Sequence, residues 1–230
     1  MSVQFDVRDD PAAACAELLV ETAGAGGHVV LTGGSTPRGA YQRAAERPEA
    51  WENAIVWFGD ERCVPPEDER SNFGMANQAL LSRARPRAVH RIRGELGPAE
   101  AADAYEQELR AAGPPEFDLL LLGVGPDGHL ASLFPGQDTL SERSRLVVGV
   151  PEAGLEPFVP RVSLTLPALS SAKRIVFLVS GESKASAVAS AFGPDARPDP
   201  KVPASLLPPL AKDVTVLLDR DAASAVKQCG

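Results

Sequence analysis

The sequence predicts an α/β fold in which a mainly parallel sheet carries helices on both faces. Short apolar segments that end in glycines or acidic residues alternate along the chain with segments of helical character, and this order is typical of parallel strands joined by helices. Two of the segments, 117–125 and 174–181, contain unbroken apolar runs, LLLL and IVFLV, as expected for central strands that are covered on both faces. The 230 residues contain no internal repeat and no evident linker, so we expect one domain spanning residues 1–230.

The elements of the first half are predicted from the residues at their ends as well as from their apolar content. Residues 27–34, with the sequence GHVVLTGG, form a strand, and a helix follows with Thr36 as its N-cap and Pro37 at its first position. Residues 54–61 (AIVWFGDE) form a second strand that ends in acidic residues. Residues 71–82 have the spacing of an amphipathic helix.

The second half continues the alternation. Residues 98–112 are rich in alanine and glutamate and begin with a proline, which predicts a helix. A further helix, at 182–192, follows the central strand that ends at residue 181. Additional strands are predicted at 89–92, 145–150, 161–166 and 214–219.

Composition and charge argue against several classes of protein. Hydrophobic residues make up 44% of the chain and charged residues 23%, as is usual for globular proteins. The net charge is −8 and the one basic segment spans residues 83–93, so no nucleic-acid partner is expected. No apolar run approaches the ~20 residues that span a bilayer, and the N-terminus lacks the pattern of a signal peptide. We therefore expect no membrane association and a cytoplasmic location.

The cysteines and histidines give no sign of a metal site. Cys15, Cys63 and Cys229 are widely spaced, which predicts neither a disulfide framework nor a metal-binding pair. No two of the three histidines have the spacing of metal ligands, so we expect no catalytic metal. The sequence leaves both a monomer and a homodimer open.

Four polar loops fall at the carboxyl ends of predicted strands, at residues 32–36, 59–62, 123–129 and 180–184. In an open α/β sheet, ligands bind beyond these ends of the strands. The convergence of four such loops predicts one shared ligand site, and it is stronger evidence than any single motif.

The loop at 32–36 has the features of an anion site. Gly33 and Gly34 allow the backbone to approach a ligand, Ser35 and Thr36 supply hydroxyl groups, and a helix begins at once. Backbone N–H groups at a helix N-terminus favour phosphate. The loop matches neither the dinucleotide motif nor the P-loop, and the alternative is a tight turn with a helix cap.

Two cationic residues are candidates for binding the same anion. Lys184 lies in the first turn of a helix, where the helix dipole disfavours a cation unless a ligand phosphate offsets it. Arg161 begins a predicted strand and is the candidate for a second charge-assisted contact. The alternative is that both are ordinary surface residues.

The loop at 59–62 places Asp60 and Arg62 directly after an apolar strand. Asp60 is a candidate for contact with a ligand hydroxyl, and Arg62 for contact with an anion or a developing oxyanion. A surface ion pair is the alternative. Ser71 is expected to cap the following helix, and Asn72, in the first turn of that helix, is a candidate substrate contact.

The loop at 123–129 carries the candidate general base. Gly125 and Gly128 permit a positive φ or a close approach of the backbone, Asp127 is placed to brace the loop, and His129 follows a central strand. A neutral imidazole is a suitable general base near pH 7. The sequence leaves open whether Asp60 or Asp127 is the partner of this imidazole.

The other candidates for catalysis are weaker. Ser132 lies three residues after His129, but the G-x-S-x-G pattern of a nucleophilic serine is absent, which disfavours a serine–histidine pair. His28 begins a strand and His90 lies in one, so both are predicted to be structural.

Four segments resemble the 6-phosphogluconolactonase family in their order and spacing, over roughly residues 27 to 207. They are LTGGSTPRGAYQ, WFGDERCVPPEDERSNFGMA, LLLLGVGPDGHLASLFPG and RVSLTLPALSSAKRIVFLVSGESKA. The resemblance implies a Rossmann-like α/β sandwich related to sugar-phosphate isomerases. It also implies cytoplasmic hydrolysis of a phosphosugar lactone, 6-phospho-D-glucono-1,5-lactone, in the oxidative pentose phosphate pathway, without a cofactor.

The resemblance assigns roles by position. His129 matches the catalytic base of the family, and Asp60 and Arg62 match its active-site pair. The loop at 33–36, Arg161 and Lys184 match its phosphate-contacting elements. One departure is Leu130, where relatives often carry threonine.

Two other functions are weighed against this one. Glucosamine-6-phosphate deaminase is similar in fold and shares GDE and DGH, but that family carries a glutamate before the Pro-Gly pair, where this chain has Phe134. Without that carboxylate the acid–base relay for isomerisation is incomplete, which favours the lactonase. A non-enzymatic sugar-phosphate sensor is the third reading, and no extra domain supports it.

Overall fold

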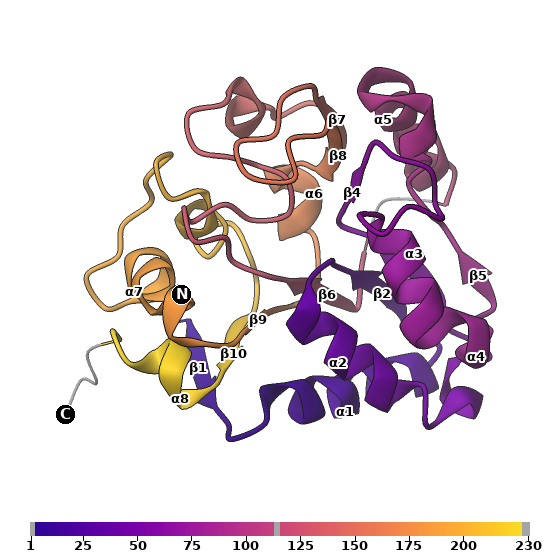
Figure 1. Ribbon diagram of the computed structural model, residues 1–230, viewed down its shortest axis with the longest axis horizontal. Helices are drawn as coiled ribbons and strands as arrows, with labels where there is room; N and C mark the ends of the chain where they lie inside the picture. Colours follow the sequence, from indigo (N-terminus) through magenta and orange to yellow (C-terminus); the bar gives the residue numbers. More distant parts are fainter. Residues whose placement is uncertain (1–2, 113–115, 227–230) are drawn as a thin grey trace.

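Seven parallel strands form the central sheet, in the order β1-β10-β9-β6-β2-β3-β5 (Figure 1). The computed structural model describes residues 3–112 and 116–226. The strands of this sheet are β1 (Gln4–Val7), β2 (His28–Leu31), β3 (Ile55–Phe58), β5 (Ala88–Val89), β6 (Leu119–Leu122), β9 (Arg174–Val179) and β10 (Val214–Leu218).

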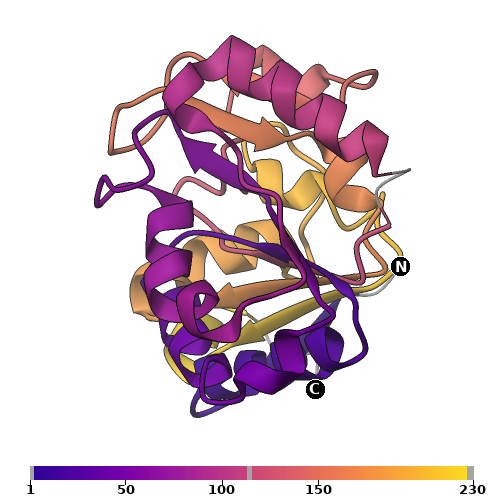
Figure 2. The same ribbon diagram turned by 90° about the vertical axis from the view of Figure 1, so that its right-hand side faces the viewer.

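Helices cover both sides of this sheet, which confirms the predicted α/β class. Figure 2 shows the sheet between α1 (Pro11–Gly24) and α2 (Ser35–Ala44) on one side and α5 (Pro98–Ala111) on the other. The shorter helices are α3 (Asn72–Ala76), α4 (Ser82–Ala84), α6 (Leu166–Ser170), α7 (Ala185–Phe192) and α8 (Arg220–Ala223). In the described ranges, no helix combines the length and the apolar content needed to cross a bilayer.

The central position of β6 follows from its sequence. All four of its leucines are fully buried, and the strand lies between β2 and β9. The chain order reverses between β2 and β6, because β3 and β5 follow β2 in one direction while β6 and β9 extend the sheet in the other. The connections that leave the carboxyl ends of β2 and β6 therefore run in opposite directions, and the crevice between them is where ligands bind in sheets of this kind.

A second, antiparallel sheet of three strands lies between the main sheet and α5 (Figure 2). Its strands are β4 (Asp60–Arg62), β8 (Arg161–Leu164) and β7 (Val147–Val150), in the order β4-β8-β7. The prediction of one strand at 54–61 was therefore wrong: β3 ends at Phe58, and after Gly59 the chain enters β4. The strands predicted at 145–150 and 161–166 exist, but they belong to this small sheet.

Three further local expectations differ from the structure. No element was predicted before residue 27, yet β1 and α1 lie there. The prediction of Thr36 as an N-cap was wrong: α2 begins at Ser35, and its N-cap is Gly34, with φ of +117°. Glycine adopts this backbone conformation without the strain that a side chain would impose, and the helix starts two residues earlier than predicted. The strand predicted at 89–92 is reduced to β5.

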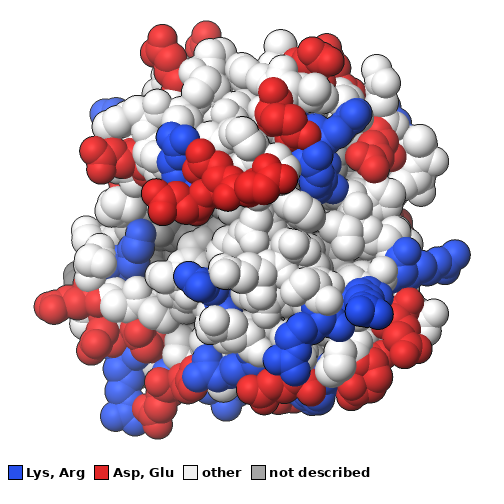
Figure 3. Space-filling view, turned by 45° about the vertical axis from the view of Figure 1, so that its right-hand side comes forward, with Lys and Arg blue, Asp and Glu red and all other residues white. Residues whose placement is uncertain are grey.

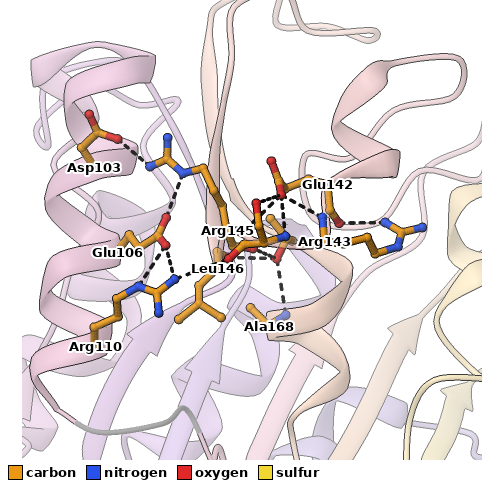
Figure 4. Close-up of polar contacts among 10 residues, drawn as sticks. Asp103, Glu106, Arg110, Glu142, Arg143, Arg145, Leu146 and Ala168 are labelled. Atoms are coloured by element: carbon orange, nitrogen blue, oxygen red, sulfur yellow. Dashed lines mark hydrogen bonds and ion pairs between the residues drawn. The ribbon is translucent and has the colours of Figure 1, made fainter.

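Helix α5 is held against the small sheet by charged side chains (Figure 4). The Glu106 carboxylate accepts hydrogen bonds from Arg110 (2.7 Å) and, through its other oxygen, from Arg145 (2.9 Å). Arg145 also donates to Asp103 (2.5 Å). Glu106 has a side chain only 11% exposed, whereas the side chain of Asp103 is 60% exposed.

Replacement of Glu106 by alanine is expected to lower the free energy of unfolding by about 1–2 kcal/mol, because it removes charge-assisted hydrogen bonds from a shielded position. Urea denaturation measures the change. Asp103→Ala is the matched control, since it removes a carboxylate from the same arginine at an exposed position and should cost less than about 0.5 kcal/mol. Equal losses in the two variants would contradict this account.

Candidate active site

The polar segments that follow β2, β3, β6 and β9 meet at a cleft of about 280 Å³. It lies where the strand order reverses. The segment after β3 was predicted as a loop, but its residues Asp60 and Arg62 lie in strand β4. The structure brings together in this cleft every site residue predicted from the sequence except Asp127, which lies just behind it. The candidates that line the cleft are Gly33, Gly34, Ser35, Thr36, Asp60, Arg62, Asn72, His129, Arg161 and Lys184.

The imidazole of His129 is held on several sides. Its Nδ1 lies 2.6 Å from a carboxylate oxygen of Asp127, and its ring packs against Phe134 with 4.7 Å between ring centroids. A side chain at Gly125 would place its Cβ 2.0 Å from Nδ1, so this position must be glycine for the imidazole to lie there. The glycines of the loop thus make room for the histidine.

Asp127, and not Asp60, contacts His129, a choice that the sequence left open. Burial by itself would raise the pKa of Asp127, but the hydrogen bond and the charge of His129 outweigh burial, and the pKa of Asp127 lies below its ordinary value. An ionised Asp127 accepts a hydrogen bond, so the Nδ1 of His129 carries the proton. Nε2 is then the nitrogen that is free to act as a base. Asp127 also accepts a hydrogen bond from the backbone N–H of His129 (3.2 Å).

The carboxylate of Asp60 is buried and held at both oxygens. Its Oδ1 accepts a hydrogen bond from the side-chain amide of Asn72 (3.2 Å), and its Oδ2 accepts one from the hydroxyl of Ser132 (2.7 Å). Ser132 therefore faces Asp60, and no hydrogen bond to His129 involves its hydroxyl in the described part of the chain. The serine–histidine pair that the sequence disfavoured is not formed.

Asn72 lines the cleft, but its amide supports Asp60. Besides Oδ1, it donates to the backbone carbonyl of Asp60 (3.0 Å). A Cβ at Gly33 would lie 2.0 Å from the Asn72 side-chain oxygen. Position 33 therefore requires glycine because its backbone lies close to the Asn72 side chain. Gly33 also borders the cleft.

Glu61 is a supporting residue that the sequence analysis missed. Its carboxylate accepts hydrogen bonds from the backbone N–H groups of Arg62, Asn72 and Phe73, each at 2.7 Å, and from the hydroxyl of Ser71 (3.0 Å). Burial raises the pKa of Glu61, and these donors oppose the rise. Successive side chains of a strand point to opposite faces, so Glu61 lies on the other face of β4 from Asp60 and Arg62. This pattern could have identified Glu61 from the sequence.

Arg62 and Arg161 are direct cross-strand partners in the small sheet, and both line the cleft. Like charges in directly opposed positions destabilise a sheet. Burial and then the charge of Arg62 lower the pKa of Arg161. This pairing of cations at one wall of the cleft is the arrangement expected where an anion binds between or beside them.

Arg161 also forms hydrogen bonds to the preceding segment, residues 151–160. Its guanidinium donates to the backbone carbonyls of Val159 (3.1 Å), Pro157 (2.7 Å) and Leu155 (3.4 Å). Leu155 borders the cleft. Part of the Arg161 guanidinium therefore binds backbone carbonyls of residues 151–160. The sequence analysis did not predict this role.

Lys184 lines the cleft from the segment that follows β9. It closes a short 3₁₀ turn, Glu182–Lys184, and precedes α7. Burial lowers the pKa of its ammonium group, and the carboxylate of Asp127 partly opposes this. The N-terminus of α2, with Ser35 and Thr36, borders the same cleft. The cleft therefore combines backbone N–H groups, which favour anions, with the cationic side chains of Arg62, Arg161 and Lys184.

Inorganic phosphate is expected to stabilise the protein against heat, because a dianion in this cleft relieves the repulsion between Arg62 and Arg161. At ten times its dissociation constant, the ligand should raise Tm by about 3–6 °C for a chain of this size. Thermal unfolding is measured with phosphate and with chloride at equal ionic strength. A rise of the same size in chloride would show that general screening, and not a bound anion, is responsible.

The two other histidines lie outside the cleft, as predicted. His28 Nδ1 accepts a hydrogen bond from the Trp57 indole (3.3 Å), and His90 stacks on the same indole with ring centroids 3.9 Å apart. Among the described residues, no three His, Cys, Asp or Glu side chains are grouped to hold a metal ion; Cys229 lies outside those residues. On the face drawn in Figure 3, acidic and basic side chains of the described residues are interspersed without a broad basic surface.

Comparisons with known proteins agree on one family. The family model for glucosamine-6-phosphate isomerases/6-phosphogluconolactonase matches residues 7–216. The 6-phosphogluconolactonase of Haemophilus influenzae is 42% identical over 166 residues, which cover 69% of this chain and 70% of the relative. The structure of a 6-phosphogluconolactonase from Trypanosoma cruzi is similar with a TM-score of 0.85 and 30% identity, covering 99% of this chain and 98% of that one. A monomeric glucosamine-6-phosphate deaminase is also similar, with a TM-score of 0.81 and 25% identity over 98% of this chain and 100% of that one.

Proposed function

This chain belongs to the family of glucosamine-6-phosphate isomerases and 6-phosphogluconolactonases, and on that premise we propose how it acts as a 6-phosphogluconolactonase. The reaction is hydrolysis of 6-phospho-D-glucono-1,5-lactone to 6-phospho-D-gluconate, a step of the oxidative pentose phosphate pathway. The cytoplasm is the expected compartment, and no cofactor is expected.

One observation carries the assignment of the chemistry. The cleft pairs an imidazole, held at Nδ1 by Asp127 (2.6 Å), with the cationic side chains of Arg62, Arg161 and Lys184. The cations suit the phosphate of the substrate, and the imidazole suits proton transfer at a carbonyl some distance from that phosphate. Binding of the phosphate then holds the lactone carbonyl close to His129.

His129 acts as a general base and then as a general acid. Its Nε2 takes a proton from a water molecule while the water oxygen forms a bond to C1 of the lactone. The carbonyl electrons move to oxygen, and a tetrahedral oxyanion results. When the oxyanion collapses, the bond between C1 and the ring oxygen breaks, and the imidazolium returns its proton to that ring oxygen. The product is the open-chain acid, which ionises in water.

The remaining side chains orient the imidazole and the substrate and stabilise the oxyanion. Asp127 keeps the imidazole in the tautomer that leaves Nε2 basic. Because Asp127 fills that role, we assign Asp60 to orienting a hydroxyl of the sugar. Arg62 or backbone N–H groups of a glycine loop stabilise the oxyanion.

The second candidate function is glucosamine-6-phosphate deamination, because a deaminase is among the similar structures. Phe134 argues against it. This residue directly precedes Pro135 and Gly136, at the position where the resemblance places a glutamate in deaminases, and its ring packs on His129. An apolar ring there offers no carboxylate for a proton relay.

The decisive experiment is a lactonase assay with freshly generated 6-phosphogluconolactone, in which acid release is followed beside a no-enzyme control. The protein should accelerate hydrolysis well above the spontaneous rate and release no ammonia from glucosamine 6-phosphate. Ammonia release would favour the deaminase. Binding of 6-phosphogluconate without acceleration would indicate a sensor.

A further inference from the structure

Ser132 connects two parts of the active site that lie far apart in the sequence. It is fully buried, and its hydroxyl donates to Oδ2 of Asp60 at 2.7 Å across 72 residues of chain. It also belongs to the segment 129–134 that carries the His129 imidazole. The hydrogen bond therefore joins the segment of the base to the carboxylate of β4.

An unusual backbone turn directs Ser132 inward. The N–H of Leu133 donates to the carbonyl of Leu130 (2.9 Å), and Ala131 between them has φ of +48°. A residue with a side chain rarely adopts this left-handed conformation, and its cost must be offset by surrounding contacts. Leu130 and Leu133 are both fully buried, which anchors the turn. As a result Ala131 borders the cleft while Ser132 faces the interior.

The backbone of Ser132 is itself held in place. The backbone N–H of Ser132 donates to the hydroxyl of Ser163 (3.2 Å), and that hydroxyl donates to the carbonyl of Leu164 (3.0 Å). Ser163 is the cross-strand partner of Asp60 in the small sheet. With Asn72 on Oδ1 and Ser132 on Oδ2, the Asp60 carboxylate cannot rotate without losing a hydrogen bond.

We propose that Ser132 is a positioning residue whose hydroxyl sets the orientation of the Asp60 carboxylate relative to His129. Ser132 touches no substrate and acts through Asp60. The proposal rests on the proposed lactonase function for its kinetic consequence, but the geometric consequence, a carboxylate held in one orientation, is independent of that function.

The kinetic test is a double-mutant cycle between Ser132→Ala and Asp60→Ala. Ser132→Ala alone should lower kcat/KM about 10- to 100-fold, as expected for loss of a hydrogen bond to a charged group. In the Asp60→Ala background the same substitution should change kcat/KM less than about twofold, because the residue through which it acts is gone. Equal effects in both backgrounds, or none in either, would overturn the proposal.

A matched control separates positioning from a general loss of packing. The hydroxyl of Ser171 donates to the carbonyl of Ala168 (2.7 Å) at the end of α6, outside the cleft-lining residues. Ser171→Ala should leave kcat/KM unchanged. Thermal unfolding of each variant confirms that the assays compare folded proteins.

Crystal structures of the wild type and of Ser132→Ala test the proposal without any activity. The Asp60 carboxylate should rotate away from its present orientation or occupy two orientations in the variant. An unchanged carboxylate would overturn the proposal even if the wild type is an active lactonase. A wild type that does not accelerate hydrolysis, with Asp60 rotated in the variant, would instead refute the proposed function and leave the positioning role supported.

Discussion

Replacement of His129 by alanine is expected to lower kcat about 10²- to 10⁴-fold, with little change in KM. In the proposed mechanism the imidazole takes the proton of the attacking water, and its loss leaves that transfer to solvent. The proposed phosphate contacts come from other segments and should be unaffected, so substrate binding should be nearly preserved. Steady-state hydrolysis of 6-phosphogluconolactone, corrected for the spontaneous reaction, gives both constants.

His90→Ala is the matched control for this prediction. Each histidine is mostly buried and has Nδ1 beside a carboxylate, at 2.6 Å from Asp127 for His129 and at 2.7 Å from Glu108 for His90. Of the histidines, which all lie in the described part of the chain, only His129 borders the cleft. His90→Ala should therefore keep the kcat of the wild type. Full turnover in His129→Ala, after subtraction of the spontaneous rate, would refute the assignment of the base.

Replacement of Lys184 by alanine is expected to reduce kcat/KM about 10- to 100-fold, chiefly through a higher KM. A hydrogen bond to a charged group contributes about 1.5–3 kcal/mol, and each ~1.4 kcal/mol corresponds to a factor of ten. Burial lowers the pKa of Lys184, and the carboxylate of Asp127 partly opposes this. In the proposed complex, the phosphate of the substrate places a negative charge beside this ammonium group.

Lys173→Ala provides the comparison for Lys184, because the two lysines flank the same strand. Lys173 precedes β9 and pairs with Asp118 (2.9 Å), whereas Lys184 follows that strand at its carboxyl end. The Lys173 variant should retain the KM of the wild type. A Lys184 variant that loses kcat at constant KM would mean that the lysine acts on the transition state and not on the bound phosphate.

Local patterns were sufficient to predict most strands and the loops of the site. The continuous leucines of β6 predicted a central strand, and all four are buried in that position. The glycines around His129 predicted a loop that brings the imidazole to a strand end, and Gly125 makes the space for the ring. These inferences succeeded because apolar periodicity and glycine content act over a few residues.

Other features depend on contacts between distant residues. The change from β3 to β4 at Gly59 was missed because the sequence on both sides reads as one strand, and only pairing with β8 separates them. The start of the chain was left without elements, although Asp10 caps α1 by accepting a hydrogen bond from Ala13 (3.0 Å).

The sequence by itself determined the α/β class, the four polar segments at the strand ends and the histidine that serves as the candidate base. One of these segments, residues 59–62, was predicted as a loop, but Asp60–Arg62 form strand β4. Only the tertiary structure decided that Asp127 orients that histidine, that Ser132 and Asn72 hold Asp60, and that Arg62 faces Arg161 across the small sheet. The physical reason is that strand register and the orientation of a buried carboxylate are set by partners many residues away. Sequence patterns report which residues are buried or flexible, but not which distant group each one meets.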